Sequence, residues 1–251
     1  AIDGTWNVAQ LWPLPSGGGP STNVDITDAI VSMTDSSRPE MKPLVIREIQ
    51  LRLASETSLP PGGDLTIPTP RWQFEGSVGG ALAQSIKLSG WSDPIGAALA
   101  VDVDIVDLAL SGPLLRSWPL PAAPWLAGID LNGKLDSDIT ITRDAAPKAP
   151  IEWHSKFELT EGRLSVDGLP RQVTELVARG EMNRRGLRLE SVGGRYGKAA
   201  MSLVGVRDGW GPGAPLHALG RIEGLLLDDS VAESIPAGFA RLWNRFRPAG
   251  E

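Results

Sequence analysis

Apolar and polar residues alternate along several stretches of this chain. In residues 151–159, Ile151, Trp153, Phe157 and Leu159 occupy odd positions, and charged residues or His fill the even positions. This period of two is typical of a β-strand with one apolar face and one wet face. Ser155 is the one exception. The same rhythm predicts further strands at residues 49–53, 99–105, 129–141, 187–189 and 201–203.

Fifteen apolar residues of the predicted strands between residues 99 and 203 form a candidate lining for a binding surface, because alternation places them on one side of a sheet. They are Val101, Val103, Ile105, Leu131, Leu135, Ile139, Ile141, Ile151, Trp153, Phe157, Leu159, Leu187, Leu189, Met201 and Leu203.

Glycine and proline punctuate the alternation, with 29 Gly and 21 Pro in 251 residues. Gly90, Gly133, Gly162 and Gly180 are among the residues expected to end strands. Short strands at such spacing favour an all-β architecture over alternating βαβ units. One stretch alone, residues 234–246, predicts an amphipathic helix with arginines on its polar side. Such a helix packs on a sheet or, alternatively, lies on a membrane surface.

Composition and charge exclude several classes. The chain has no Cys, which removes disulfide frameworks, thiolate zinc sites and Cys nucleophiles. The net charge of −6 argues against a nucleic-acid partner. No run of apolar residues reaches the length of a membrane-spanning helix.

Catalytic and metal-binding patterns are also missing from the sequence. His154 and His217 lack the neighbouring ligands of a zinc site, and no nucleophile elbow, P-loop or dinucleotide fingerprint occurs. Asp102, Asp104 and Asp107 could hold calcium, but an acidic strand edge explains them equally well. The sequence therefore predicts a protein that is not an enzyme, with no catalytic residue, no metal and no cofactor; a carbohydrate-active enzyme is a minor alternative.

Four sequence blocks occur twice in the same order. Residues 77–80 recur as 191–194 with the same Ser-Val-Gly-Gly sequence, and residues 86–90 resemble residues 201–205. Residues 108–119 resemble 225–236, and residues 43–51 resemble 170–178, where Glu48 corresponds to Glu175. Repetition of this kind predicts stacked copies of one supersecondary unit.

The predicted fold is all-β and mainly antiparallel: an extended, twisted and curled sheet that forms an open apolar groove from two tandem repeats, with one short helix near the C-terminus. The first repeat comprises residues 1–127 and the second residues 128–251, joined in one continuous sheet as one structural domain. The apolar face needs a cover, which curling, a partner or a ligand can supply. A closed sandwich core formed by the same residues is the alternative.

The repeated blocks also carry a family resemblance. Residues 164–170 (LSVDGLP), 176–182 (LVARGEM), 186–190 (GLRLE) and 193–205 resemble the AsmA-like proteins, which include the TamB type. The resemblance is clearest over residues 128–251. It implies a periplasmic β-groove protein, anchored in the inner membrane through parts of the chain not present here, that conducts phospholipid acyl chains between membranes. It implies no catalytic residues. An envelope scaffold or a secretion-system interaction protein, with a related fold and no lipid cargo, is the second hypothesis.

Overall fold

Eleven β-strands dominate the computed structural model, which describes residues 23–34, 43–58, 69–93, 98–117, 128–146, 149–167, 169, 171–211 and 213–225. The strands follow one another across a single sheet in chain order, with β1 at one edge and β11 at the other. This confirms the predicted all-β, antiparallel fold. The elements are β1 (Asn23–Met33), β2 (Leu44–Ser58), β3 (Thr69–Val78), β4 (Ser85–Ser92), β5 (Leu99–Leu110), α1 (Gly112–Ser117), β6 (Ile129–Arg143), β7 (Glu152–Val166), β8 (Val173–Asn183), β9 (Gly186–Tyr196), β10 (Ala199–Asp208) and β11 (Leu216–Glu223).

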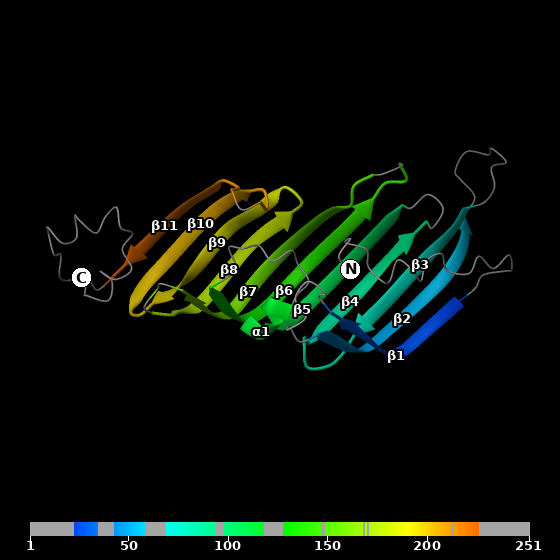
Figure 1. Ribbon diagram of the computed structural model, residues 1–251, viewed down its shortest axis with the longest axis horizontal. Coiled ribbons are helices and arrows are strands. Elements are labelled where there is room, and N and C mark those ends of the chain that lie inside the picture. The colour runs from blue at the N-terminus through cyan, green and yellow to red at the C-terminus, as the bar shows by residue number, and fades with distance from the viewer. Residues whose placement is uncertain are drawn as a thin grey trace. The chain divides into compact units, whose positions relative to one another are not determined.

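The chain divides into two compact units. Unit 1 comprises Ala1–Leu108, Ser117–Pro119 and Asp136–Ser155, and it holds β1–β4 and β5 up to Leu108, which lie side by side in Figure 1. Unit 2 comprises Ala109–Arg116, Leu120–Leu135 and Lys156–Glu251, and it holds β8–β11. The boundary predicted between the two sequence repeats, residues 1–127 and 128–251, stays a prediction.

Five acidic residues inside strands have a left-handed backbone, with φ between 50° and 55°. They are Asp28, Glu48, Asp107, Glu161 and Glu175. The strand pairing of β1 with β2, and of β8 with β9, shifts register beside Asp28 and Glu175, which is the mark of a β-bulge. Each bulge inserts one extra residue. Apolar residues at odd positions before the bulge are therefore followed by apolar residues at even positions after it, or the reverse. In β5, for example, Val103 and Ile105 precede the bulge at odd positions, and the buried Leu108 follows it at an even position.

These left-handed residues recur with a period of six strands. They occupy β1, β2 and β5, and then β7 and β8. Gly224, directly after β11, has a φ of 69°. The first, second and fifth strands of each set of six therefore share one backbone feature, and Glu48 and Glu175, matched by sequence, share it as well.

The expectation that Gly90, Gly133, Gly162 and Gly180 end strands is wrong. All four lie inside strands, so the longest strands reach 15 residues. A large side chain of the neighbouring strand lies close to each glycine: a Cβ atom added to Gly90 would be 3.0 Å from the Phe74 ring. Glycine is selected here by close approach across the sheet and does not terminate the strand.

Ser155, which interrupts the alternation in β7, has a structural reason to be polar. It is 2% exposed, and its hydroxyl shares a 2.8 Å hydrogen bond with the hydroxyl of Ser137 in β6, which is 6% exposed. One hydroxyl donates and the other accepts, so each buried oxygen has a hydrogen bond, which is the condition for burying a polar group on an apolar face.

The helical segments differ from the expectation. Helix α1 is only six residues long, too short for the hydrophobic pattern to predict; Ser111 Oγ accepts a hydrogen bond from the Leu114 N–H at its start. The helix predicted over residues 234–246 lies outside the described residues.

We expect Ser155→Ala to lower the free energy of unfolding by about 1–3 kcal/mol, because it removes the hydrogen bond that the two buried hydroxyls share. The double variant Ser137→Ala/Ser155→Ala should be less destabilised than the sum of the two single variants. Urea denaturation of the four proteins measures both effects. Strict additivity would show that the two hydroxyls do not support each other.

We expect Asp107→Val to destabilise the protein by about 1–3 kcal/mol, because a β-branched side chain fits a left-handed backbone poorly. Asp107→Gly removes the same carboxylate but accepts that backbone, so it should cost less than Asp107→Val. Thermal unfolding followed by circular dichroism compares the two variants. Equal losses would indicate that the carboxylate matters and the bulge does not.

Candidate functional site: an apolar face and a polar hollow

Three apolar rows cross the first five strands of unit 1. The pairing register brings one apolar or glycine residue from each strand into every row. In chain order the rows are Ala29–Ile49–Val78–Ile86–Ile105, Ile26–Leu51–Gly76–Leu88–Val103 and Val24–Leu53–Phe74–Gly90–Val101. Between them they form a continuous apolar surface on one face of unit 1.

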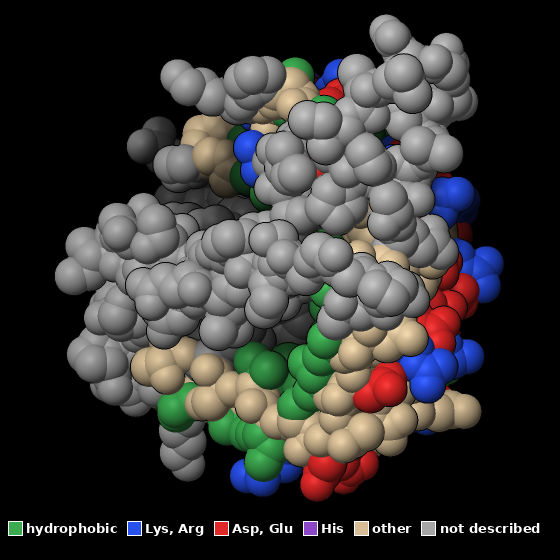
Figure 2. Space-filling model, turned by 90° about the vertical axis from the view of Figure 1, so that its right-hand side faces the viewer, with side chains coloured by type: hydrophobic (Ala, Val, Ile, Leu, Met, Phe, Trp, Pro, Cys, Tyr) green, Lys and Arg blue, Asp and Glu red, His purple; other side chains and the backbone are tan. Residues whose placement is uncertain are grey.

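This apolar face of unit 1 is only partly buried. Ile26 and Val24 are each 38% exposed, and Val101, Val103 and Ile105 are half-buried. In the whole described part of the chain, ten apolar residues are buried, and three of them are alanines. Figure 2, which views the molecule from the β1 side, shows hydrophobic side chains on one side of the nearest strands and charged side chains along the other.

Unit 2 has apolar rows of its own. The register gives Gly180–Leu189–Gly205–Ala218, Ala178–Val192–Leu203–Gly220 and Gly194–Met201–Ile222. A buried cluster of Leu159, Val173, Leu176 and Ala178 lies within this unit, and Leu110, from the segment before α1, packs against it. The apolar face of unit 2 is therefore more closely packed than that of unit 1.

The structure places the fifteen predicted lining residues as follows. Leu159 is 5% exposed and belongs to the buried cluster, whereas Ile151 precedes β7 and is 51% exposed. The other thirteen are half-buried and lie in β5, β6, β7, β9 and β10. Leu131 and Met201 pack against the buried cluster, and Phe157 lies over Gly180, 3.0 Å from where its Cβ would be. Residues of β1–β4 complete the rows of unit 1, and none of them is among the predicted lining residues.

The opposite face of unit 1 carries a polar row. Cross-strand pairs join Asp25, Arg52, Glu75, Ser89 and Asp102 in that order. Arg52 Nε donates a 2.9 Å hydrogen bond to Asp25 Oδ1. This bond, then the charge of Asp25 and that of Glu75, raise the pKa of the Arg52 guanidinium above its ordinary value. Thr140 of β6 extends the row, because its hydroxyl donates to Asp102 Oδ1 at 2.9 Å.

A hollow of about 990 Å³ lies over the middle of β1–β6 in unit 1. Most of these strands contribute three consecutive residues to its lining: one apolar residue and the polar residues directly before and after it. The polar residues outnumber the apolar ones and point away from the apolar rows, so the hollow opens on the polar face. Val103 and Ile139 are the only predicted lining residues that border it. Its charged side chains are Asp25, Arg52, Glu75, Lys87, Asp102, Asp104 and Asp138. Such a surface suits water and not acyl chains.

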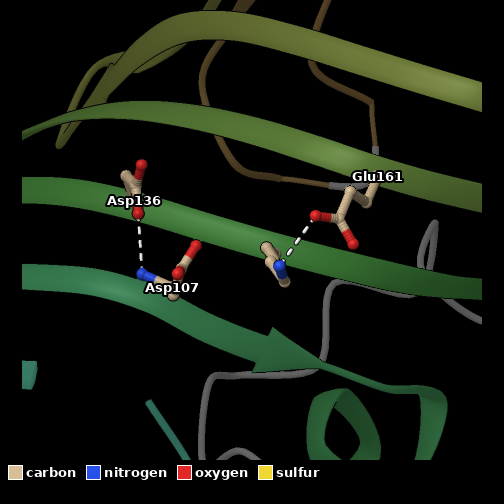
Figure 3. Close-up of polar contacts among 4 residues, drawn as sticks. Asp107, Asp136 and Glu161 are labelled. Carbon is tan, nitrogen blue, oxygen red and sulfur yellow. Dashed lines mark hydrogen bonds and ion pairs between the residues drawn. The ribbon is translucent and has the colours of Figure 1, made fainter. Parts of the chain in front are cut away.

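Ion pairs and hydrogen bonds hold the bulged residues. In unit 1, the Asp107 N–H donates to Asp136 Oδ1 at 2.7 Å, and in unit 2, Lys134 Nζ contacts Glu161 Oε1 at 2.7 Å (Figure 3). Arg195 Nε contacts Glu175 Oε2 at 3.0 Å, so this arginine has a carboxylate partner. These pairs are exposed, and each contributes at most about 1 kcal/mol.

The described residues offer little for chemistry. No group of three or more His, Asp or Glu residues among them could hold a metal ion. Asp102 and Asp107 make the contacts given above, and His217 lies exposed in β11. No helix in the described part of the chain is long and apolar enough to cross a membrane.

No protein family, curated protein or solved structure matches this chain.

We expect Gly90→Ala to destabilise unit 1 by about 1–3 kcal/mol, since the new methyl group would overlap the Ala100 carbonyl oxygen and press on the Phe74 ring. Gly193→Ala is the matched control, because its nearest neighbour would be 3.4 Å away, an ordinary contact. Denaturant midpoints measure the difference. A Gly193→Ala loss as large as that of Gly90→Ala would contradict the role assigned to close approach.

Proposed function

We propose that this chain is a non-enzymatic lipid-binding segment, whose apolar rows in unit 1 take up the acyl chains of phospholipids. The supporting observation is the half-exposed apolar surface formed by the three rows across β1–β5. Each methylene moved from water onto such a surface contributes about 0.8 kcal/mol, so a long acyl chain gains several kcal/mol without any polar contact.

The biological setting of this proposal comes from the family resemblance. An AsmA-like chain would work in the periplasm and conduct acyl chains between membranes, with the membrane contacts supplied by other parts of the protein. Parallel rows fit conduction, because an acyl chain can shift along a row without breaking a specific hydrogen bond. The polar hollow has no part in this proposal.

A structural role is the second candidate, and the packing of unit 2 favours it. There Leu159, Val173 and Leu176 are each no more than 5% exposed, and Leu110 packs against them. An apolar face that the chain already covers has little area left for a ligand. In an envelope scaffold or secretion-system component, the apolar surface of unit 1 would receive a protein and not a lipid.

Site-specific photo-crosslinking tests the proposal. A photoreactive amino acid at Leu88, in the middle apolar row, should crosslink phospholipid carrying a radiolabelled acyl chain. The same amino acid at Ser89, the next residue of β4 on the polar face, should crosslink at least about tenfold less, because alternation turns it away from the rows.

Native mass spectrometry of the purified chain supplies the second measurement. Bound phospholipid that Leu88→Glu removes and Ser89→Glu retains supports the proposal, provided that both variants keep the strand signal in circular dichroism. Crosslinking that is equal at the two positions, or a protein adduct at Leu88 in place of lipid, would overturn it.

A further inference from the structure

Strand β11 is an edge strand with an exposed surface. Its one neighbour in the sheet is β10, and all eight of its residues are exposed. Leu219 is 75% exposed, Leu216 62% and Ile222 51%. Within the described residues, nothing pairs with the outer side of β11. A regular edge of this kind offers unpaired N–H and C=O groups to another strand.

The register shows that β11 is the counterpart of β5. In the first copy of the repeat, Leu88 pairs with Val103, and in the second copy the matching residue Leu203 pairs with Gly220. Ile86 with Ile105 and Met201 with Ile222 follow the same rule. The left-handed Asp107 of β5 likewise corresponds to the left-handed Gly224, which directly follows β11.

The outer side of β5 receives β6, and two contacts define how. Thr140 donates to Asp102 on the polar face. Asp136 accepts the N–H of the bulged Asp107, a group that the bulge removes from the regular ladder. The partner of β5 is thus a strand in which apolar residues alternate with Asp and Thr. The equivalent N–H beside β11 belongs to Gly224.

β5 and β11 differ in charge at one position on the polar face. Asp104 and Asp138 both border the polar hollow, each two residues along its strand from the Asp102–Thr140 contact. Antiparallel pairing therefore brings these two carboxylates opposite each other on β5 and β6. Arg221 stands at the position of Asp104 in β11, and its present contact is the exposed Glu223 of its own strand. A carboxylate at the Asp138 position would meet a cation there.

We propose that the outer edge of β11 adds an antiparallel strand from a partner polypeptide, an extended segment that alternates apolar and acidic residues in the manner of β6. Its apolar residues extend the rows of unit 2, one carboxylate faces Arg221, and a second accepts the Gly224 N–H. This is β-strand addition, in which backbone hydrogen bonds give affinity and alternate side chains give selectivity. The inference is independent of the lipid proposal.

A peptide with the sequence of β6, residues 129–143, is the probe, and the whole 251-residue chain is the target. Amide hydrogen exchange should show at least about fivefold slowing at residues 217–224 when the peptide is present. A scrambled peptide of the same composition should leave these amides unchanged. Slowing confined to β1, exchange of the peptide with the internal β6, or no slowing at all would overturn the proposal.

A charge reversal tests the orientation of the added strand. Arg221→Asp should weaken binding of the peptide about three- to tenfold, since it replaces an attraction by a repulsion at an exposed position. A peptide carrying Asp138→Arg should restore affinity for Arg221→Asp and lose affinity for the unaltered chain. Arg188→Asp, an exposed arginine on β9 away from the edge, is the matched control. Equal weakening by both arginine substitutions would show only a general charge effect and would overturn the proposed register.

Discussion

The constraint on which this structure depends is that every strand must keep its apolar side chains on one face over 8 to 15 residues. A single inserted residue would send the rest of a strand's apolar residues into water. The left-handed residues Asp28, Glu48, Asp107, Glu161 and Glu175 mark the points where the sequence changes parity. The bulge absorbs the extra residue, so the apolar face continues beyond it. The backbone strain of each bulge is offset by the apolar burial that it preserves.

The two copies of the repeat share backbone geometry more than residue identity. Between the β4–β5 pair and the β10–β11 pair, the register is the same although Val103 has become Gly220 and Asp104 has become Arg221. What both copies retain is the apolar or small residue on one face and the left-handed residue at the end of the paired region. Side chains on the polar face face water, so their charge is free to change, and Arg221 is one result.

Alternation was sufficient to predict the fold class and the strands around Val101, Ile139, Phe157 and Leu203, because one wet face leaves a period-2 pattern in the sequence. It gave the wrong role to the glycines, which were expected to end strands. The sequence of a single strand does not reveal that Phe74 of the next strand lies over Gly90. It also missed the bulges, although they leave a signal. Each bulge has the same four-residue pattern: an apolar residue, a residue of any type, an acidic residue, and an apolar residue or glycine. Ile46-Arg47-Glu48-Ile49 is an example. The polar hollow was not predictable, because its volume depends on how six strands are placed together.

The two faces of unit 1 differ in polarity, so they suit different kinds of ligand. On the polar face, Arg52 is paired with Asp25, and Thr140 with Asp102, so these three charged side chains have partners within the sheet. On the apolar face, Val24, Ile26 and Leu51 have no comparable polar partners, and their exposure to water is unfavourable. Gly90 leaves room for the Phe74 ring to lie across the neighbouring strand, so this ring protrudes less from that face. A low, continuous apolar surface selects little for ligand shape, and this favours flexible hydrocarbon over a ligand held by specific contacts.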